Sequence, residues 1–173
     1  MGMNKKCVLD IETESLDPKE GRIICIGTRD IESSKTIVFY DENEKQMIKD
    51  FLEYFHDKGF NEVIGYNILF DIRYIFARCL KYNLFSNGFF KTFYTDLMNI
   101  MKSVKNVYSM NKPGTLNEWT EFLFGAGKVP LPDSICNMFE QGKISEIIEY
   151  NKRDLEITQM LWERVEKVLN NGN

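Results

Sequence analysis

The chain has 173 residues, 43% of them apolar and 13% aromatic, which is the size and composition of one domain with a substantial core. Its 26 acidic and 22 basic residues give a formal charge of −4, which argues against a protein that holds nucleic acid by a strongly basic surface. The sequence contains no run of about 18 apolar residues, so no membrane-spanning helix is predicted. The cysteines form no CxxC pair and favour a reduced core in the cytoplasm: Cys7, Cys25, Cys79 and Cys136.

The first forty residues predict a hairpin with one added strand. Strands are expected over residues 6–12 and 21–30, joined by the turn-rich segment 13–20. A third strand over residues 35–40 would add an edge to this antiparallel set.

A helix, a strand and a second helix are expected next. Residues 42–58 place apolar side chains at helical spacing, with charged residues between them. Residues 61–67 predict a short strand, and residues 68–84 a helix that follows it directly. The stripe that this helix buries is expected to contain Ile72, Ile75, Phe76, Cys79 and Leu80.

The remainder of the chain is expected to be mostly helical. Residues 86–105 predict a strand and a helix, and residues 113–128 a capped helix that ends at glycines. The segment 128–134 breaks the pattern, and residues 145–169 form a long amphipathic closing helix. No repeat or linker is evident, so residues 1–173 are expected to form a single α/β domain with a mixed sheet and flanking helices.

Two acids stand where the apolar run of the first strand ought to continue, Asp10 and Glu12. Residues two apart in an extended strand point to the same face, so the two carboxylates lie side by side. Like charges on one side of a buried strand are costly unless a cation or a proton lies between them. The pair therefore predicts a bound cation.

Two further acids differ from the solvated acids of ordinary helix faces. Asp71 lies one turn into the second predicted helix, among apolar neighbours. Asp154 lies on the closing helix, one turn after Tyr150 on the same face, although Asp154 taken alone is better interpreted as an ordinary surface acid.

Together the four acids are a set of oxygen ligands from three separate elements. Hard divalent cations such as Mg²⁺ and Mn²⁺ prefer such ligands. Two such ions, about 3.5 to 4 Å apart, can clamp the attacking and leaving oxygens of a phosphoryl displacement. The acids thus favour a metal-dependent hydrolase.

Three stretches in order, "DIET" followed by "SLDP" and "GRIICIG", then "GYNILFD", then "YNKRD", resemble the motifs of the DEDDy class of 3′-to-5′ exonucleases. The middle stretch is most similar to the proofreading exonuclease domains of family-B DNA polymerases and their free-standing relatives. The resemblance extends roughly from Val8 to Thr158 and implies a ribonuclease-H-like fold, with an antiparallel hairpin first in a mixed sheet flanked by helices.

The resemblance also implies a catalytic set. Tyr150 would orient the attacking water, and two Mg²⁺ or Mn²⁺ ions would be held by the acids at matching positions. A sister class has histidine in place of the tyrosine, and the chain's only histidine, His56, lies far from the third motif. The implied metal ligands are Asp10, Glu12, Asp71 and Asp154.

The resemblance implies substrate contacts at four positions. The backbone amide of Thr13 would meet the terminal 3′-hydroxyl, and Leu16 would wedge between the last two bases. Asn67 would position the substrate or the motif backbone, and Phe70 would pack against either the terminal nucleotide or the core. Such contacts work on any base and imply little sequence preference. One departure from the family pattern, Glu14, adds a charge near this end of the substrate.

The resemblance implies hydrolysis from the 3′ end of a single strand, releasing nucleoside monophosphates. DNA is favoured by the family-B likeness, a polymerase or repair protein is the expected partner, and no polymerase domain is expected in the same polypeptide. An exoribonuclease and a non-catalytic nucleic-acid-binding module remain as alternatives, and another two-metal hydrolase such as a phosphatase is the least favoured. Six lysines are candidates to line the path of the strand, although a solvated surface is the favoured role for each of them: Lys5, Lys6, Lys102, Lys105, Lys112 and Lys128.

Overall fold

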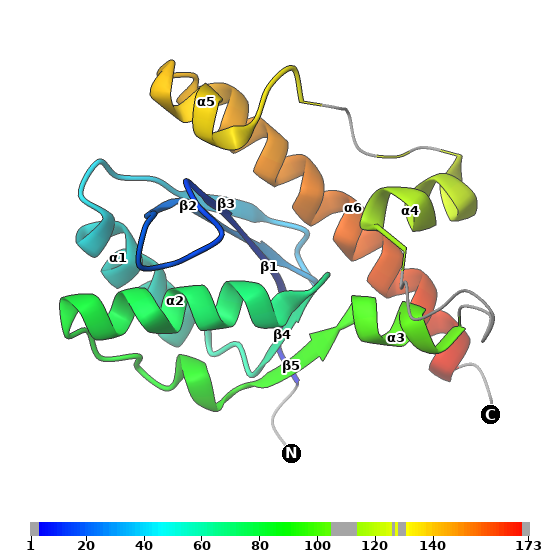
Figure 1. Cartoon of the computed structure of the whole chain (residues 1–173). Coiled ribbons are helices and arrows are strands. Elements are labelled where there is room, and N and C mark those ends of the chain that lie inside the picture. The colour runs from blue at the N-terminus through cyan, green and yellow to red at the C-terminus, as the bar shows by residue number, and fades with distance from the viewer. Residues whose placement is uncertain (1–3, 105–113, 126, 128–130, 171–173) are drawn as a thin grey trace.

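The computed structural model describes residues 4–104, 114–125, 127 and 131–170, and a five-stranded sheet lies at its centre (Figure 1). The strand order is β3-β2-β1-β4-β5, so the strand that bears the first motif is the middle one. β2 is antiparallel to β1 and to β3, whereas β4 runs parallel to β1 and β5 parallel to β4. The expected mixed sheet with the hairpin first is confirmed. The strands are β1 (Lys6–Thr13), β2 (Ile23–Asp30), β3 (Thr36–Phe39), β4 (Glu62–Gly65) and β5 (Phe93–Asp96).

The helices follow the apolar periodicity of the sequence in most places. Two short elements were not expected, the 3-10 turn η1 and the helix α5, because neither is long enough to show a periodic pattern. α5 begins where Ser134 accepts a hydrogen bond from the backbone N–H of Asn137, directly after the proline-containing segment. The helical elements are α1 (Glu44–Lys58), α2 (Ile68–Tyr82), η1 (Phe89–Lys91), α3 (Leu97–Val104), α4 (Leu116–Phe124), α5 (Ile135–Glu140) and α6 (Ile144–Asn170).

Helices cover both faces of the sheet, and β1 contributes to both (Figure 1). Leu9 and Ile11 join the larger core cluster with residues of α1 and α2. Asp10, which points the other way because side chains alternate along a strand, contacts α6 through Asn151. The acids of β1 are therefore on the face that α6 covers.

The parallel pairing of β4 with β1 determines where α2 begins. Because parallel strands end at the same edge of a sheet, the turn after β4 starts α2 at the edge where β1 ends. Asn67 makes this turn with a φ of 62°, a left-handed conformation that asparagine tolerates better than most residues. The first turn of α2 thus brings Asp71 to the end of β1.

The predicted buried stripe of α2 is wrong at two positions. Ile72, Ile75 and Cys79 are buried, but Phe76 is 48% exposed and Leu80 is 68% exposed. The buried arc is rotated because it includes Arg78, whose guanidinium is paired with Glu44. A paired arginine can occupy a position that apolar periodicity alone assigns to a hydrophobic side chain.

Three of the four cysteines lie in the core, as expected. Cys7, Cys25 and Cys79 are buried, and burial raises the pKa of the Cys79 thiol to about 11. Cys136, on α5, is only half-buried. Within the described part of the chain, none of the helices is long and apolar enough to span a bilayer.

Candidate active site

Three carboxylates converge at the end of the central strand. Asp10 and Glu12 of β1 and Asp154 of α6 each offer an oxygen, and these oxygens lie within 4.8 Å of one another. Glu12 is 9% exposed and Asp154 is 4% exposed, so the interpretation of Asp154 as a surface acid is wrong. An all-oxygen set at this spacing fits the requirements of Mg²⁺ or Mn²⁺.

Asp71 lies beside this group but does not belong to it at that distance. Its Oδ1 accepts a hydrogen bond of 2.9 Å from the backbone N–H of Ile11, the residue between the two acids of β1. Burial, and secondarily the negative charge of Asp10, raise the pKa of the Asp71 carboxyl well above its usual value. The two aspartates therefore oppose each other's ionisation, a repulsion that a shared cation would offset.

A residue that the sequence analysis missed holds Asp10. Asn151 of α6 is 0% exposed, and its Nδ2 donates a hydrogen bond of 2.7 Å to Oδ2 of Asp10. Its position directly after Tyr150 was the available signal. The neighbours of this asparagine in "YNKRD" are polar, so the sequence does not indicate that its side chain is buried. Its position after Tyr150 was therefore not enough to predict a role in the site.

The remaining catalytic candidate is Tyr150, one turn before Asp154 on α6 and half-buried. It also lines a cavity of about 270 Å³ that includes Met138 of α5.

Thr13, the first of the predicted substrate contacts, is the last residue of β1 and follows an irregularity in the β1–β2 pairing. Its Oγ1 donates a hydrogen bond of 2.9 Å to the carbonyl of Ser15. This bond shapes the start of the loop that follows β1.

A cavity of about 390 Å³ contains three of the four predicted substrate contacts, Leu16, Asn67 and Phe70. Leu16 forms part of the rim and is 83% exposed, whereas Phe70 is half-buried and its ring packs at a tilt against that of Tyr74, with 5.7 Å between the ring centroids. Phe70 thus faces both the cavity and the core, as its two interpretations allowed. The other lining residues are Pro18, Leu69, Arg73, Tyr74, Asp96, Met98 and Asn99.

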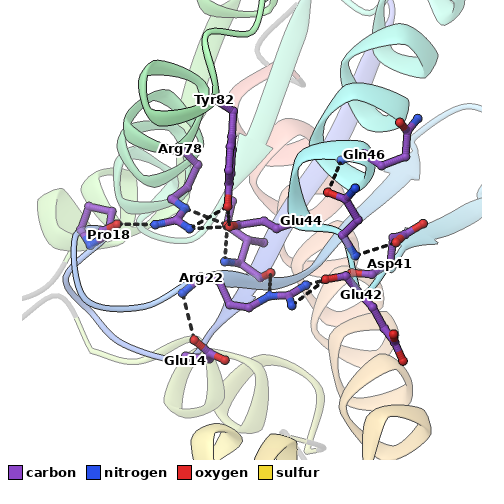
Figure 2. Close-up of polar contacts among 11 residues, drawn as sticks. Glu14, Pro18, Arg22, Asp41, Glu42, Glu44, Gln46, Arg78 and Tyr82 are labelled. Atoms are coloured by element: carbon purple, nitrogen blue, oxygen red, sulfur yellow. Dashed lines mark hydrogen bonds and ion pairs between the residues drawn. The ribbon is translucent and has the colours of Figure 1, made fainter.

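A buried ion pair holds the loop that carries Leu16 (Figure 2). Glu44 accepts hydrogen bonds of 2.8 Å from Nε of Arg78 and from the backbone N–H of Ile23. Arg78 also donates through Nη1 to the carbonyl of Pro18 at 2.8 Å. The middle of the loop, at Pro18, and its end, at Ile23, are therefore tied to α2 and α1, which fixes one wall of the cavity.

Two of the candidate lysines lie away from the acids. Lys5 directly precedes β1 and Lys6 is its first residue, so both lie at the opposite end of the strand from the acids. Lys6 pairs with Glu166 at 2.6 Å and lies over the ring of Trp162. Lys102 lies on α3, and three of the named lysines fall outside the described residues, namely Lys105, Lys112 and Lys128.

The sheet order and the helices on its two faces define a mixed α/β protein. More specifically, the chain belongs to the family described as "DNA polymerase family B, exonuclease domain", whose model matches residues 7–115. That range includes Asp10, Glu12 and Asp71, while Tyr150 and Asp154 follow it.

Two similar proteins extend over nearly the whole chain. Uncharacterized protein MJ0365 of Methanocaldococcus jannaschii is 28% identical over 171 residues, covering 91% of this chain and 93% of that protein. The family B DNA polymerase of the archaeon Pyrobaculum calidifontis is 17% identical, with a TM-score of 0.80 over 97% of this chain. The chain spans 25% of that polymerase, and the likeness shows the fold.

Proposed function

We propose that the protein is a Mg²⁺- or Mn²⁺-dependent exonuclease that removes nucleotides one at a time from the 3′ end of single-stranded DNA and releases nucleoside monophosphates. The observation that carries this proposal is the convergence of Asp10, Glu12 and Asp154 within 4.8 Å at the end of the central strand. Membership of the family B exonuclease-domain family supports a nuclease and favours DNA over RNA.

The four acids would hold two ions. Asp10, Glu12 and Asp154 would ligate one, and Asp10 and Asp71 would share the second, which would offset the repulsion between these two carboxyls. Bound ions of this kind supply an activated water at neutral pH and neutralise charge on the oxygens of the scissile phosphate. Tyr150 would orient the water through its hydroxyl, which donates or accepts one hydrogen bond while remaining neutral.

The cavity lined by Leu16 and Phe70 would take the terminal nucleotide. In the sequence, Leu16 follows a proposed ligand by four residues and Phe70 directly precedes another, which supports a position near the ions for the phosphate of this nucleotide. The lining is mostly apolar, with an exposed leucine at its rim, which suits stacking and wedging of a base without regard to its identity. Partners are a single-stranded 3′ end and, by family likeness, a polymerase or repair protein in the cytoplasm.

Degradation of a single strand labelled at its 5′ end tests the proposal, once as DNA and once as RNA, with Mg²⁺ or Mn²⁺. A ladder that shortens from the 3′ end, and that chelator abolishes, is the expected result on DNA. A faster ladder on RNA would favour the exoribonuclease alternative. Intact strands under every metal, bound but not cut, would contradict the enzyme and leave a binding module.

A further inference from the structure

We infer that Asn151 is a positioning residue that orients the Asp10 carboxylate for metal binding, and that Gly27 provides the space that Asn151 requires. The inference rests on the proposed function, because it assigns roles within the same metal site. Neither residue is among the proposed ligands, and neither would contact the nucleotide.

The amide of Asn151 contacts Asp10 in two places. Its Nδ2 donates to Oδ2 of Asp10 at 2.7 Å and to the main-chain carbonyl of the same residue at 3.3 Å. A donor that contacts both the side chain and the backbone of Asp10 limits rotation of the carboxylate. Residues that hydrogen-bond to a metal ligand without contacting the metal commonly orient that ligand for binding.

The other end of the amide has no compensating contact. Oδ1 of Asn151 is buried and accepts no hydrogen bond from any described residue. A buried acceptor without a donor costs free energy, and an apolar side chain of similar size would avoid that cost. If the amide were flipped, its oxygen would face the ionised carboxylate of Asp10, which can only accept hydrogen bonds. The orientation with Nδ2 toward Asp10 is therefore the one that allows a hydrogen bond. The asparagine is therefore better explained by its contact with Asp10 than by stability.

Gly27 of β2 lies opposite Asp10 in the β1–β2 pairing, under the same part of α6. A Cβ at this position would lie 1.9 Å from Oδ1 of Asn151 and 2.6 Å from Cδ1 of Leu155. Any larger residue would push the amide from its place or lift α6 from the sheet. The glycine is thus required by the close approach of the asparagine.

Calorimetric titration of the full chain with Mn²⁺ alone tests the inference without relying on nuclease activity. We expect Asn151→Ala to weaken Mn²⁺ binding by about 10- to 100-fold, the usual effect of removing a residue that orients a ligand. Asn151→Leu keeps a similar size but lacks the donor, so it should weaken binding as well, and it serves if Asn151→Ala does not fold. Gly27→Ala should act in the same direction.

Gly59→Ala is the matched control for the glycine. Gly59 ends α1 with a φ of 68°, and an added Cβ there meets no atom within 4 Å. Its substitution should lower the melting temperature through backbone strain while leaving Mn²⁺ affinity unchanged. The double variant Gly27→Ala/Asn151→Ala should bind Mn²⁺ more tightly than two independent losses predict, because both changes act through one contact.

The outcomes separate this inference from the proposed function. Folded Asn151 variants that bind Mn²⁺ as tightly as the wild type would overturn the inference alone. A wild-type chain that binds no Mn²⁺ would overturn the proposed metal-dependent function, and the inference with it. Equal weakening by Gly27→Ala and Gly59→Ala would assign the glycine effect to general destabilisation and contradict the role of Gly27.

Discussion

The protein has two sites with buried carboxylates, and the negative charge of these carboxylates is balanced differently at each site. Glu44 is 4% exposed and meets hydrogen-bond donors, among them the guanidinium of Arg78 and the hydroxyl of Tyr82 (Figure 2). Asp10, Glu12 and Asp154 instead bring three carboxylates within 4.8 Å of one another. At the first site the guanidinium of Arg78 balances the charge of Glu44, and the pair positions a loop. At the second site three like charges lie close together, an arrangement that favours binding of a cation.

The largest expected effect comes from removing a carboxylate of the acidic group. Asp154→Asn should lower the nuclease rate on the order of 10³-fold, because a bound ion supplies several kcal/mol of transition-state stabilisation. The rate of single-nucleotide release in excess Mg²⁺ measures this loss. Asp50→Ala, an exposed carboxylate on α1, is the matched control and should leave the rate unchanged. A nuclease that tolerates Asp154→Asn would contradict the proposed site.

Breaking the ion pair between Arg78 and Glu44 should instead lower the stability of the fold. Arg78→Met leaves Glu44 buried without its guanidinium, which should lower the free energy of unfolding by about 3 to 5 kcal/mol. Urea denaturation measures the change. The double variant Arg78→Met/Glu44→Met removes both charges and should recover much of the loss. Equal stability of the single and double variants would contradict the role of the ion pair.

A neutral side chain beside the acidic group, at position 71, should stabilise the metal-free protein. Asp71→Asn keeps an oxygen for the Ile11 N–H but removes a carboxyl whose pKa is raised by burial and by Asp10. At neutral pH in chelator it should raise the free energy of unfolding by on the order of 1 kcal/mol. The same variant should lose stabilisation by Mg²⁺. Destabilisation in chelator would contradict the electrostatic account of Asp71.

The pH dependence of the metal-free wild type follows with a definite sign. A carboxyl with a raised pKa binds more protons in the folded state than in the unfolded state, so stability falls as pH rises. This contribution is full below the unfolded pKa of about 4 and is lost as pH passes the raised folded value. Thermal unfolding in chelator between pH 4 and 8 should show a decline attributable to Asp71 that Asp71→Asn removes.

The smallest expected effect belongs to the rim of the cavity. Leu16 is 83% exposed, so Leu16→Ala should leave the melting temperature unchanged. Loss of its apolar contact with a base should raise KM for single-stranded DNA by roughly 5-fold, equivalent to about 1 kcal/mol, with kcat little changed. Leu80→Ala is the control, because Leu80 is 68% exposed on α2 and does not line the cavity. A KM unchanged by Leu16→Ala would contradict the wedge.

Sequence patterns predicted the sheet and its acids because those patterns have a simple physical origin. The two-residue spacing of Asp10 and Glu12 predicted that they share one face, and the apolar neighbours of Asp71 predicted that it is not an ordinary surface acid. Contacts between distant elements left no such pattern. The burial of Asn151 over Gly27 and the pairing of Arg78 with Glu44 depend on how α6 and α1 pack, and one sequence does not show that.

The central claim is that the converging acids bind the divalent ions of a nuclease. Anomalous diffraction from crystals grown with Mn²⁺ tests this claim directly, because it locates the metal without relying on activity. We predict a peak between the carboxylates of Asp10, Glu12 and Asp154, and its loss in Asp154→Asn. A saturated crystal with no Mn²⁺ at these carboxylates would contradict the account.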